Sequence, residues 1–336
     1  MSTGLLIRAM TGLLPVACFL AFLLYLDSYK LVRLRLVLVV ILGGAITAGL
    51  GYFINIQLVA AVSLEPAAFS RYIAPVTEEV LKALIIVWLI RAHRVGFLVD
   101  AAIFGFAVGT GFAVIENLYY LGLFPEANLG TWIVRGFGTA IMHGGATAIF
   151  ALIALTMIER GRKGLAPYVP GFVLAVALHS AYNHFFLSPI ASTVGIIVVL
   201  PPLMYAVFQH SEKAVSEWLG TGFDDHTEML ELINSGQLSD SPIGHYLHEL
   251  RDRFHGPVVA DLLCYLRLHT ELALRAKGIL MMREAGLEAP VGERTRAKFA
   301  EMRYLEKSIG PTGRLALKPV LYMSHKELWQ LYMLGK

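Results

Sequence analysis

The chain has 336 residues, of which 56% are hydrophobic and 16% are charged, and its formal net charge is +3. Together with a mean hydropathy of +0.62, this composition excludes an ordinary soluble globular protein and indicates a polytopic membrane protein. The small net charge and the lack of a basic block argue against a nucleic-acid partner.

Seven apolar runs follow one another along the first two thirds of the chain. Each is close to the length of about 20 helical residues that spans the hydrocarbon core of a bilayer. They cover residues 5–25, 34–54, 72–89, 97–124, 132–158, 168–187 and 190–209. We therefore predict an all-α fold, a polytopic bundle of about seven transmembrane helices embedded in the lipid bilayer.

Basic residues alternate between the loops that join these runs. The loops after the first, third and fifth runs hold Lys30, Arg33 and Arg35, then Arg91 and Arg94, then Arg160, Arg162 and Lys163. The other loops hold little more than Arg71 and Arg135. The positive-inside rule then predicts a multi-pass protein of the cell membrane, with its N-terminus outside and its C-terminus in the cytoplasm.

The composition changes near residue 211. Residues 1–210 hold only 12 of the 28 Lys and Arg residues, although they make up most of the chain. In residues 211–336 apolar residues recur at three- and four-residue spacing, with charged residues between them. We expect a transmembrane domain over 1–210 and a soluble, mostly helical, cytoplasmic C-terminal domain over 211–336, which binds a partner that the sequence does not identify.

Ionisable residues lie inside four of the apolar runs. The third run, "PVTEEVLKALIIVWLI", carries two carboxylates and a lysine, and each ionised side chain near the middle of a membrane helix costs roughly 2.5–3.5 kcal/mol. The full set is Glu78, Glu79 and Lys82 in the third run, Glu116 and Asn117 in the fourth, Arg135 and His143 in the fifth, and His179, Asn183 and His184 in the sixth. Such residues point to a functional site rather than to a simple anchor.

These polar groups share one depth in the bilayer. At 1.5 Å per helical residue, Glu78, Glu116, His143 and His179 lie about 9–16 Å below the outer ends of their helices. Glu78 and Lys82 are four residues apart, so we expect them to project together and to neutralise one another. Small residues at four-residue spacing, such as Gly105 with Gly109, predict close helix packing around the site.

Carboxylates and imidazoles in one partly desolvated layer suit general acid–base chemistry. The sequence has no Gly-x-Ser-x-Gly nucleophile motif and no His-Glu-x-x-His zinc helix. What remains is attack on a carbonyl by a water that is activated by glutamate, or by a metal with mixed His and Glu ligands.

Four short motifs resemble those of the PrsW intramembrane proteases, which share a clan with the CAAX-processing prenyl proteases and bacteriocin-processing-like proteins. They are "EEVLK" at 78–82, "FAVIE" at 112–116, "MHG" around His143 and "HSAYN" at 179–183. The resemblance covers roughly residues 70–190. In the prenyl-protease branch the second motif ends in His rather than Glu116, and an arginine follows one position after Lys82. These departures match the PrsW branch.

The resemblance implies cleavage of a membrane-anchored protein substrate near the outer membrane face, such as first-site cleavage of an anti-sigma factor. One of Glu78 and Glu79 would activate the water, and Glu116 would assist it or ligate a metal. His179 and Asn183 would stabilise the oxyanion.

The resemblance leaves open whether a metal is bound. His143 would orient the water, or it would complete a Zn²⁺ site with His179 and Glu116. Lys82, Arg135 and Asn117 would support these groups.

Two other functions fit intramembrane Glu and His residues. One is a proton or cation transporter, which paired repeats of broken helices would indicate, but the sequence has no such repeat. The other is a non-catalytic scaffold that binds substrate helices. The presence of every Glu and His of the motifs argues against this alternative.

Overall fold

The structure is a computed structural model that describes residues 3–62, 64–287, 290–321, 326 and 329–330, with the side chains of 221 and 222 left aside. Every regular element in this part of the chain is helical, which confirms the all-α prediction. The chain forms two compact units, Met1–Ser211 and Glu212–Lys336, and the long helix α9 (Pro189–Asn234) contributes to both.

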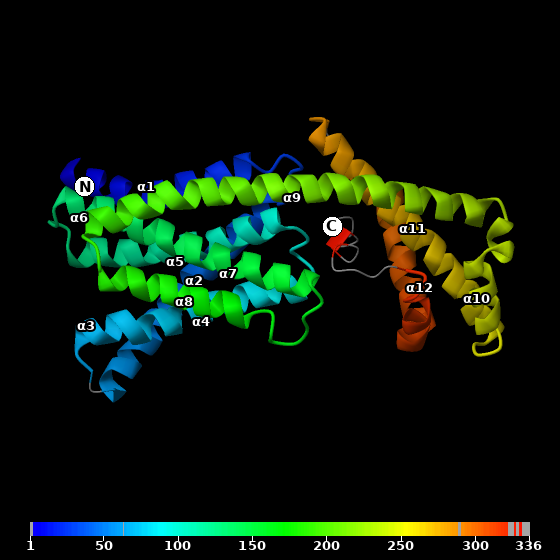
Figure 1. The fold of residues 1–336 in the computed structure, drawn as a ribbon, viewed down its shortest axis with the longest axis horizontal. Coiled ribbons are helices and arrows are strands. Elements are labelled where there is room, and N and C mark those ends of the chain that lie inside the picture. The colour runs from blue at the N-terminus through cyan, green and yellow to red at the C-terminus, as the bar shows by residue number, and fades with distance from the viewer. Residues whose placement is uncertain (1–2, 63, 288–289, 322–325, 327–328, 331–336) are drawn as a thin grey trace. The chain divides into compact units, whose positions relative to one another are not determined.

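The first unit is a bundle of long apolar helices that run side by side (Figure 1). They are α1 (Thr3–Tyr25), α2 (Leu34–Ala61), α4 (Ala74–Arg91), α5 (Leu98–Leu123), α7 (Ile141–Glu159), α8 (Val169–His184) and the first part of α9. Many of their large apolar side chains, such as Leu42 and Val198, are exposed, as expected for a surface that faces lipid.

Within the described residues, five helical stretches are long and apolar enough to cross a membrane: α1, α2, α5, Leu129–Glu159 and α9. The predicted count of seven is therefore not confirmed. Helix α8 has only 16 residues, and α4 carries four charged side chains among its 18 residues. Both helices are apolar elsewhere, and both belong to the bundle.

Helix α5 lies at the centre of the bundle, between α2 and α7, and most of its residues are buried. Glycines make this close packing possible. A methyl group at Gly109 would lie 2.3 Å from the carbonyl oxygen of His143 on α7, and one at Gly111 would lie 1.9 Å from that of Ile41 on α2. The small residues thus bring α5 close to the helix that carries His143.

Two π-helical segments interrupt the predicted regular helices. Segment η1 (Phe69–Ile73) lies between the short α3 (Pro66–Ala68) and α4, and segment η2 (Val134–Ala140) lies between α6 (Leu129–Ile133) and α7. π-Helical turns are rare and often occur at functional sites. Each of these two segments leads into a helix that carries ionisable residues, α4 or α7.

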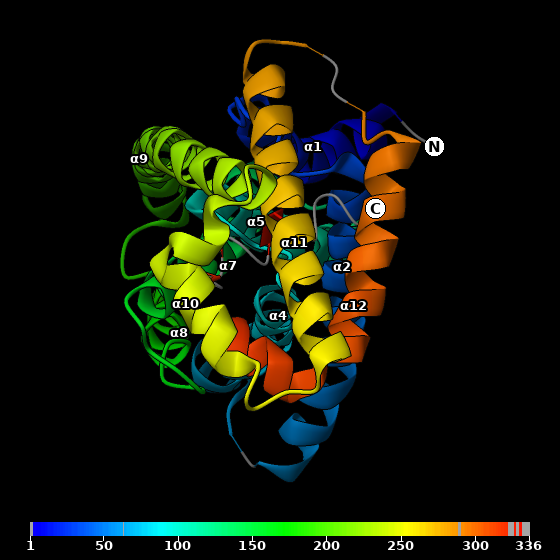
Figure 2. The ribbon, with the colours of Figure 1, turned by 90° about the vertical axis from the view of Figure 1, so that its right-hand side faces the viewer.

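The second unit contains η3 (Gln237–Asp240), α10 (Pro242–Leu250), α11 (Gly256–Glu284) and α12 (Glu293–Leu317). Helices α11 and α12 pack against each other along much of their length, and Figure 2 shows them with α10. Leu262, Leu266 and Leu280 of α11 are buried. The face of α11 that the three- and four-residue spacing predicts is thus the one that forms the core of this unit.

Candidate active site

The charged side chains near the start of α4 point in two different directions. Lys82 is buried and its Nζ lies 2.5 Å from Oε1 of Glu79, a residue that is also buried. The expected pairing of Lys82 with Glu78 is thus wrong. Positions three and four residues apart are both neighbours on a helix, and the pairing with Glu79 leaves Glu78 facing the cavity described below.

Glu79 also holds a histidine from α8. Nδ1 of His179 lies 2.9 Å from the same Oε1 atom of Glu79. A carboxylate accepts a hydrogen bond from a ring N–H, so the proton of a neutral His179 is on Nδ1 and Nε2 carries a free lone pair. Glu79 therefore fixes both the orientation and the tautomer of His179.

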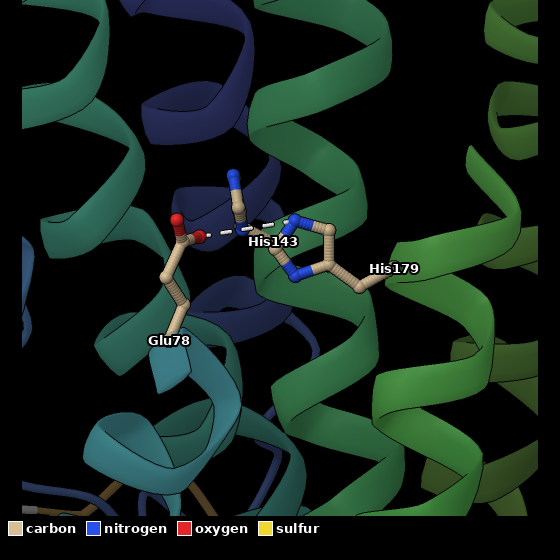
Figure 3. Close-up of side chains that lie close together, drawn as sticks. All are labelled: Glu78, His143 and His179. Atoms are coloured by element: carbon tan, nitrogen blue, oxygen red, sulfur yellow. Dashed lines mark ion pairs between the residues drawn. The ribbon is translucent and has the colours of Figure 1, made fainter. Parts of the chain in front are cut away.

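Three side chains from three helices form the one group among the described residues that has the arrangement of a metal site. Glu78, His143 and His179 each offer a ligand atom, and these atoms lie within 4.8 Å of one another. Figure 3 shows the three side chains converging from α4, α7 and α8. The sequence analysis placed Glu116 with the two histidines, whereas Glu78 takes this place in the structure.

Two observations fit a divalent cation at this group. Nε2 of His143 is buried and makes no hydrogen bond, although it lies 3.3 Å from Oε2 of Glu116, so this ring nitrogen is available to a cation. His179 shows the carboxylate–histidine arrangement through Glu79 that commonly orients a metal ligand. Two imidazoles and one carboxylate are a usual set of three protein ligands for Zn²⁺.

Lys82 lies behind the second histidine as well. Its Nζ is 3.1 Å from Nδ1 of His143 and 4.6 Å from the ring centre of Phe112, the first residue of the "FAVIE" motif. This contact engages Nδ1 and leaves Nε2 as the ring nitrogen of His143 that lies near Glu116. One buried lysine thus bridges Glu79 and His143.

A second charged pair lies on the other side of His143. Oε2 of Glu116 is 3.1 Å from an Nη atom of Arg135 and 3.3 Å from Nε2 of His143, although neither contact has hydrogen-bond geometry. Nε of Arg135 donates to Oδ1 of Asn117 at 2.9 Å, and the guanidinium lies 3.9 Å from the ring centre of Tyr120. The side chain of Glu116 is a quarter exposed, but its Oε2 is buried.

Asn117 connects this pair to the rest of the bundle. Its amide donates to the carbonyl oxygen of Gly12 on α1 at 2.7 Å, while its Oδ1 accepts from Arg135 of η2. The π-helical segment places Arg135 in this position, and no sequence pattern in the fifth run indicates such a segment.

These residues line a cavity of about 520 Å³, which we call the site cavity. Glu78, Glu116, Arg135, His143, His179 and Asn183 all contribute to its wall, while Glu79 and Lys82 lie behind it. Asn183 also donates to the carbonyl oxygen of Ser70 in η1 at 2.9 Å. Its amide carries a second N–H, so it can still donate into the cavity.

Sequence reasoning missed several residues of this wall. The Nδ2 atom of Asn55 on α2 is 3.4 Å from Oε1 of Glu78, and Tyr52, Tyr119 and Tyr182 line the cavity too. Asn55 directly follows the apolar run at 34–54, and its position inside α2 (Leu34–Ala61) becomes clear only in the structure. Tyrosines are common in membrane helices, and nothing in the sequence sets these three apart.

The arrangement can bind a cation, hold a carboxylate next to water, and place cations near a developing negative charge.

A model of the PrsW family of intramembrane metalloproteases matches residues 32–208, which is more than half of the chain. The matched region contains every residue of the site cavity. No curated protein and no solved structure matches the chain.

Proposed function

The chain belongs to the PrsW family of intramembrane metalloproteases, and we propose that it cuts a membrane-anchored protein close to the outer face of the cell membrane. The observation that carries the proposal is the convergence of Glu78, His143 and His179 on one cavity wall. The substrate class that we favour is an anti-sigma factor or a similar regulator.

In this proposal Glu78, His143 and His179 hold a Zn²⁺ ion. Zinc in such a site polarises the carbonyl of the peptide bond and makes a bound water more acidic. Glu79 does not touch the cavity. It orients His179 and neutralises Lys82, which makes it a positioning residue.

Glu116 takes the proton from the attacking water and gives it to the leaving amine. Its side chain lines the site cavity, and its Oε2 lies 3.3 Å from Nε2 of His143, so it is next to the proposed metal ligands, where a general base must act. Arg135 offsets the charge of Glu116, and Asn117 holds Arg135 in place. These roles make Arg135 and Asn117 supporting residues.

Asn183 provides the hydrogen bond to the oxyanion. Its side chain lines the site cavity and one of its N–H groups is tied to Ser70, so the other is held in a fixed direction. A well-placed donor of this kind contributes about 3–4 kcal/mol to the transition state.

The location at the outer face rests on charge and depth. The basic loops lie at the ends of α1, α4 and α7, whereas Glu78 lies near the start of α4 and His179 near the end of α8. With the basic loops in the cytoplasm, the site cavity lies in the outer half of the bilayer. The C-terminal unit is then cytoplasmic and binds a regulatory partner there.

The test is cleavage and metal content measured on the same preparation. Detergent-purified wild type, Glu78→Gln and Glu65→Gln, which changes an exposed carboxylate before α3, are analysed for zinc and incubated with a panel of single-span reporter proteins. We expect about one zinc per chain and cleavage for wild type and Glu65→Gln, and neither for Glu78→Gln. A chelator should stop cleavage, and added zinc should restore it.

Cleavage by a zinc-free preparation would contradict the metal and would favour a water that glutamate activates alone. Failure to cut any reporter, together with ion flux through vesicles that contain the protein, would favour the transporter.

A further inference from the structure

A second, larger cavity adjoins the site cavity. It has a volume of about 930 Å³ and we call it the flanking cavity. Tyr120, Arg135, Thr139 and Phe185 belong to the walls of both cavities. The flanking cavity extends from this shared wall to the connection between α5 and α6 and to the start of α9, with Leu123 and Ile190 on its rim.

The wall of the flanking cavity is mostly apolar, and its parts are tied to the bundle. Arg8 of α1 donates a hydrogen bond to the carbonyl oxygen of Pro125 and lies 3.2 Å from Glu126. The side chain of Asn128 caps α6 by accepting from the backbone N–H of Thr131 at 2.9 Å. These contacts hold the connection between α5 and α6 in place, so the cavity exists before anything binds.

Trp132 packs the inner side of this wall against α1. The residue is 1% exposed, and a methyl group at Gly12 would be 3.0 Å from Cε3 of its indole. Its Nε1 is buried and makes no hydrogen bond, so the indole is enclosed by protein rather than presented to the cavity.

We propose that the flanking cavity binds the apolar stretch of the substrate polypeptide on one side of the bond that is cut. This inference rests on the proposed function. A protease must hold its substrate beside the catalytic groups, and the shared wall makes the flanking cavity continuous with them.

Disulfide cross-linking tests the path of the substrate without turnover. The background is Glu78→Gln, in which the two native cysteines, Cys18 and Cys264, are replaced by alanine. Single cysteines are then placed at Ile190 in the flanking cavity, at Asn55 in the site cavity, and at Leu14. Leu14 lines a separate apolar groove formed by α1, η2, α7 and α9, so Leu14→Cys is the matched control for non-specific contact in the membrane.

A single-span reporter that wild type cleaves carries one cysteine at successive positions around the cut. We expect Asn55→Cys to cross-link at the cut and Ile190→Cys to cross-link within a few residues on one side only. Leu14→Cys should not cross-link. Cross-linking at Asn55 but not at Ile190 would overturn this inference alone and would mean that lipid fills the flanking cavity. No cross-link at either position, although wild type cuts the reporter, would also overturn this inference. The proposed function fails separately, if wild type cuts none of the reporters in the panel.

Discussion

The Oε1 atom of Glu79 lies 2.9 Å from Nδ1 of His179, a residue 100 positions further along the chain. The same oxygen lies 2.5 Å from Nζ of Lys82, which in turn approaches Nδ1 of His143 at 3.1 Å. Glu79 and Lys82 therefore hold the two histidines from behind, while Glu78 faces the cavity from the adjacent position.

Glu79→Gln should weaken zinc binding without abolishing it. The amide oxygen of Gln can still accept from His179, but the amide cannot neutralise Lys82. Loss of such an outer contact typically lowers metal affinity 10–100-fold. Competition with a zinc chelator measures the affinity, and Glu78→Gln, which lacks a ligand, should retain no zinc. Weaker zinc binding by Glu79→Gln than by Glu78→Gln would exchange the roles of Glu78 and Glu79.

Glu116→Gln should lower kcat about 10²–10⁴-fold, the usual contribution of a general base, while zinc stays bound. Kinetics on a cleavable reporter and elemental analysis of the same sample check both halves of this prediction. Glu65→Gln, which changes an exposed carboxylate before α3, is the control and should behave as wild type. Loss of zinc from Glu116→Gln would instead make Glu116 a ligand.

Gly109→Ala should destabilise the membrane unit. The added methyl group would lie 2.3 Å from the carbonyl oxygen of His143, and forcing the helices apart costs roughly 1–3 kcal/mol. Gly122→Ala, on the same helix but with open space around it, should be neutral or slightly stabilising. Thermal unfolding in detergent compares the two, and equal midpoints would show that α5 and α7 can separate at no cost.

Acid should destabilise the C-terminal unit through His269 of α11. Burial lowers the pKa of His269 from 6.5 to about 4, and His226 adds to this shift. Between pH 6.5 and pH 4 the unfolded chain binds a proton that the folded chain does not, so the stabilisation is complete above pH 6.5 and decreases as the pH falls. Between pH 7 and pH 5.5 the loss is about 1 kcal/mol.

Urea-dependent hydrogen exchange of the α11 amides in the full chain measures this free energy. His269→Phe should remove the pH dependence while leaving α11 folded at pH 7. An unchanged slope in His269→Phe would assign the effect to another group.

The sequence predicts the helices of the membrane unit well because apolar runs and their flanking charges are local features. The run predicted at 97–124 forms α5 at Leu98–Leu123. The shared depth of Glu78, Glu116, His143 and His179 also follows from local counting along each helix, and the structure brings all four to one cavity.

The remaining details depend on rotation and register, which local patterns do not fix. Nothing in the fifth run predicts the π-helical turn that carries Arg135, and the spacing of Glu78, Glu79 and Lys82 permits either salt bridge. The contact of Glu79 with His179, on a helix much later in the chain, fixes Glu79 and leaves Glu78 to face the cavity. The contribution of Asn55 is likewise a matter of helix packing.

The position of α4 has a consequence for biosynthesis. This helix is not among those apolar enough to cross a membrane by themselves, and its partner His179 is made 100 residues after Glu79. At about 5–20 residues per second, the ribosome needs about 5–20 s to supply that partner. During this interval Glu79 and Lys82, which both lie in α4, can already neutralise each other. We expect the nascent chain to keep α4 near the insertion machinery or against α2 until α7 and α8 have emerged.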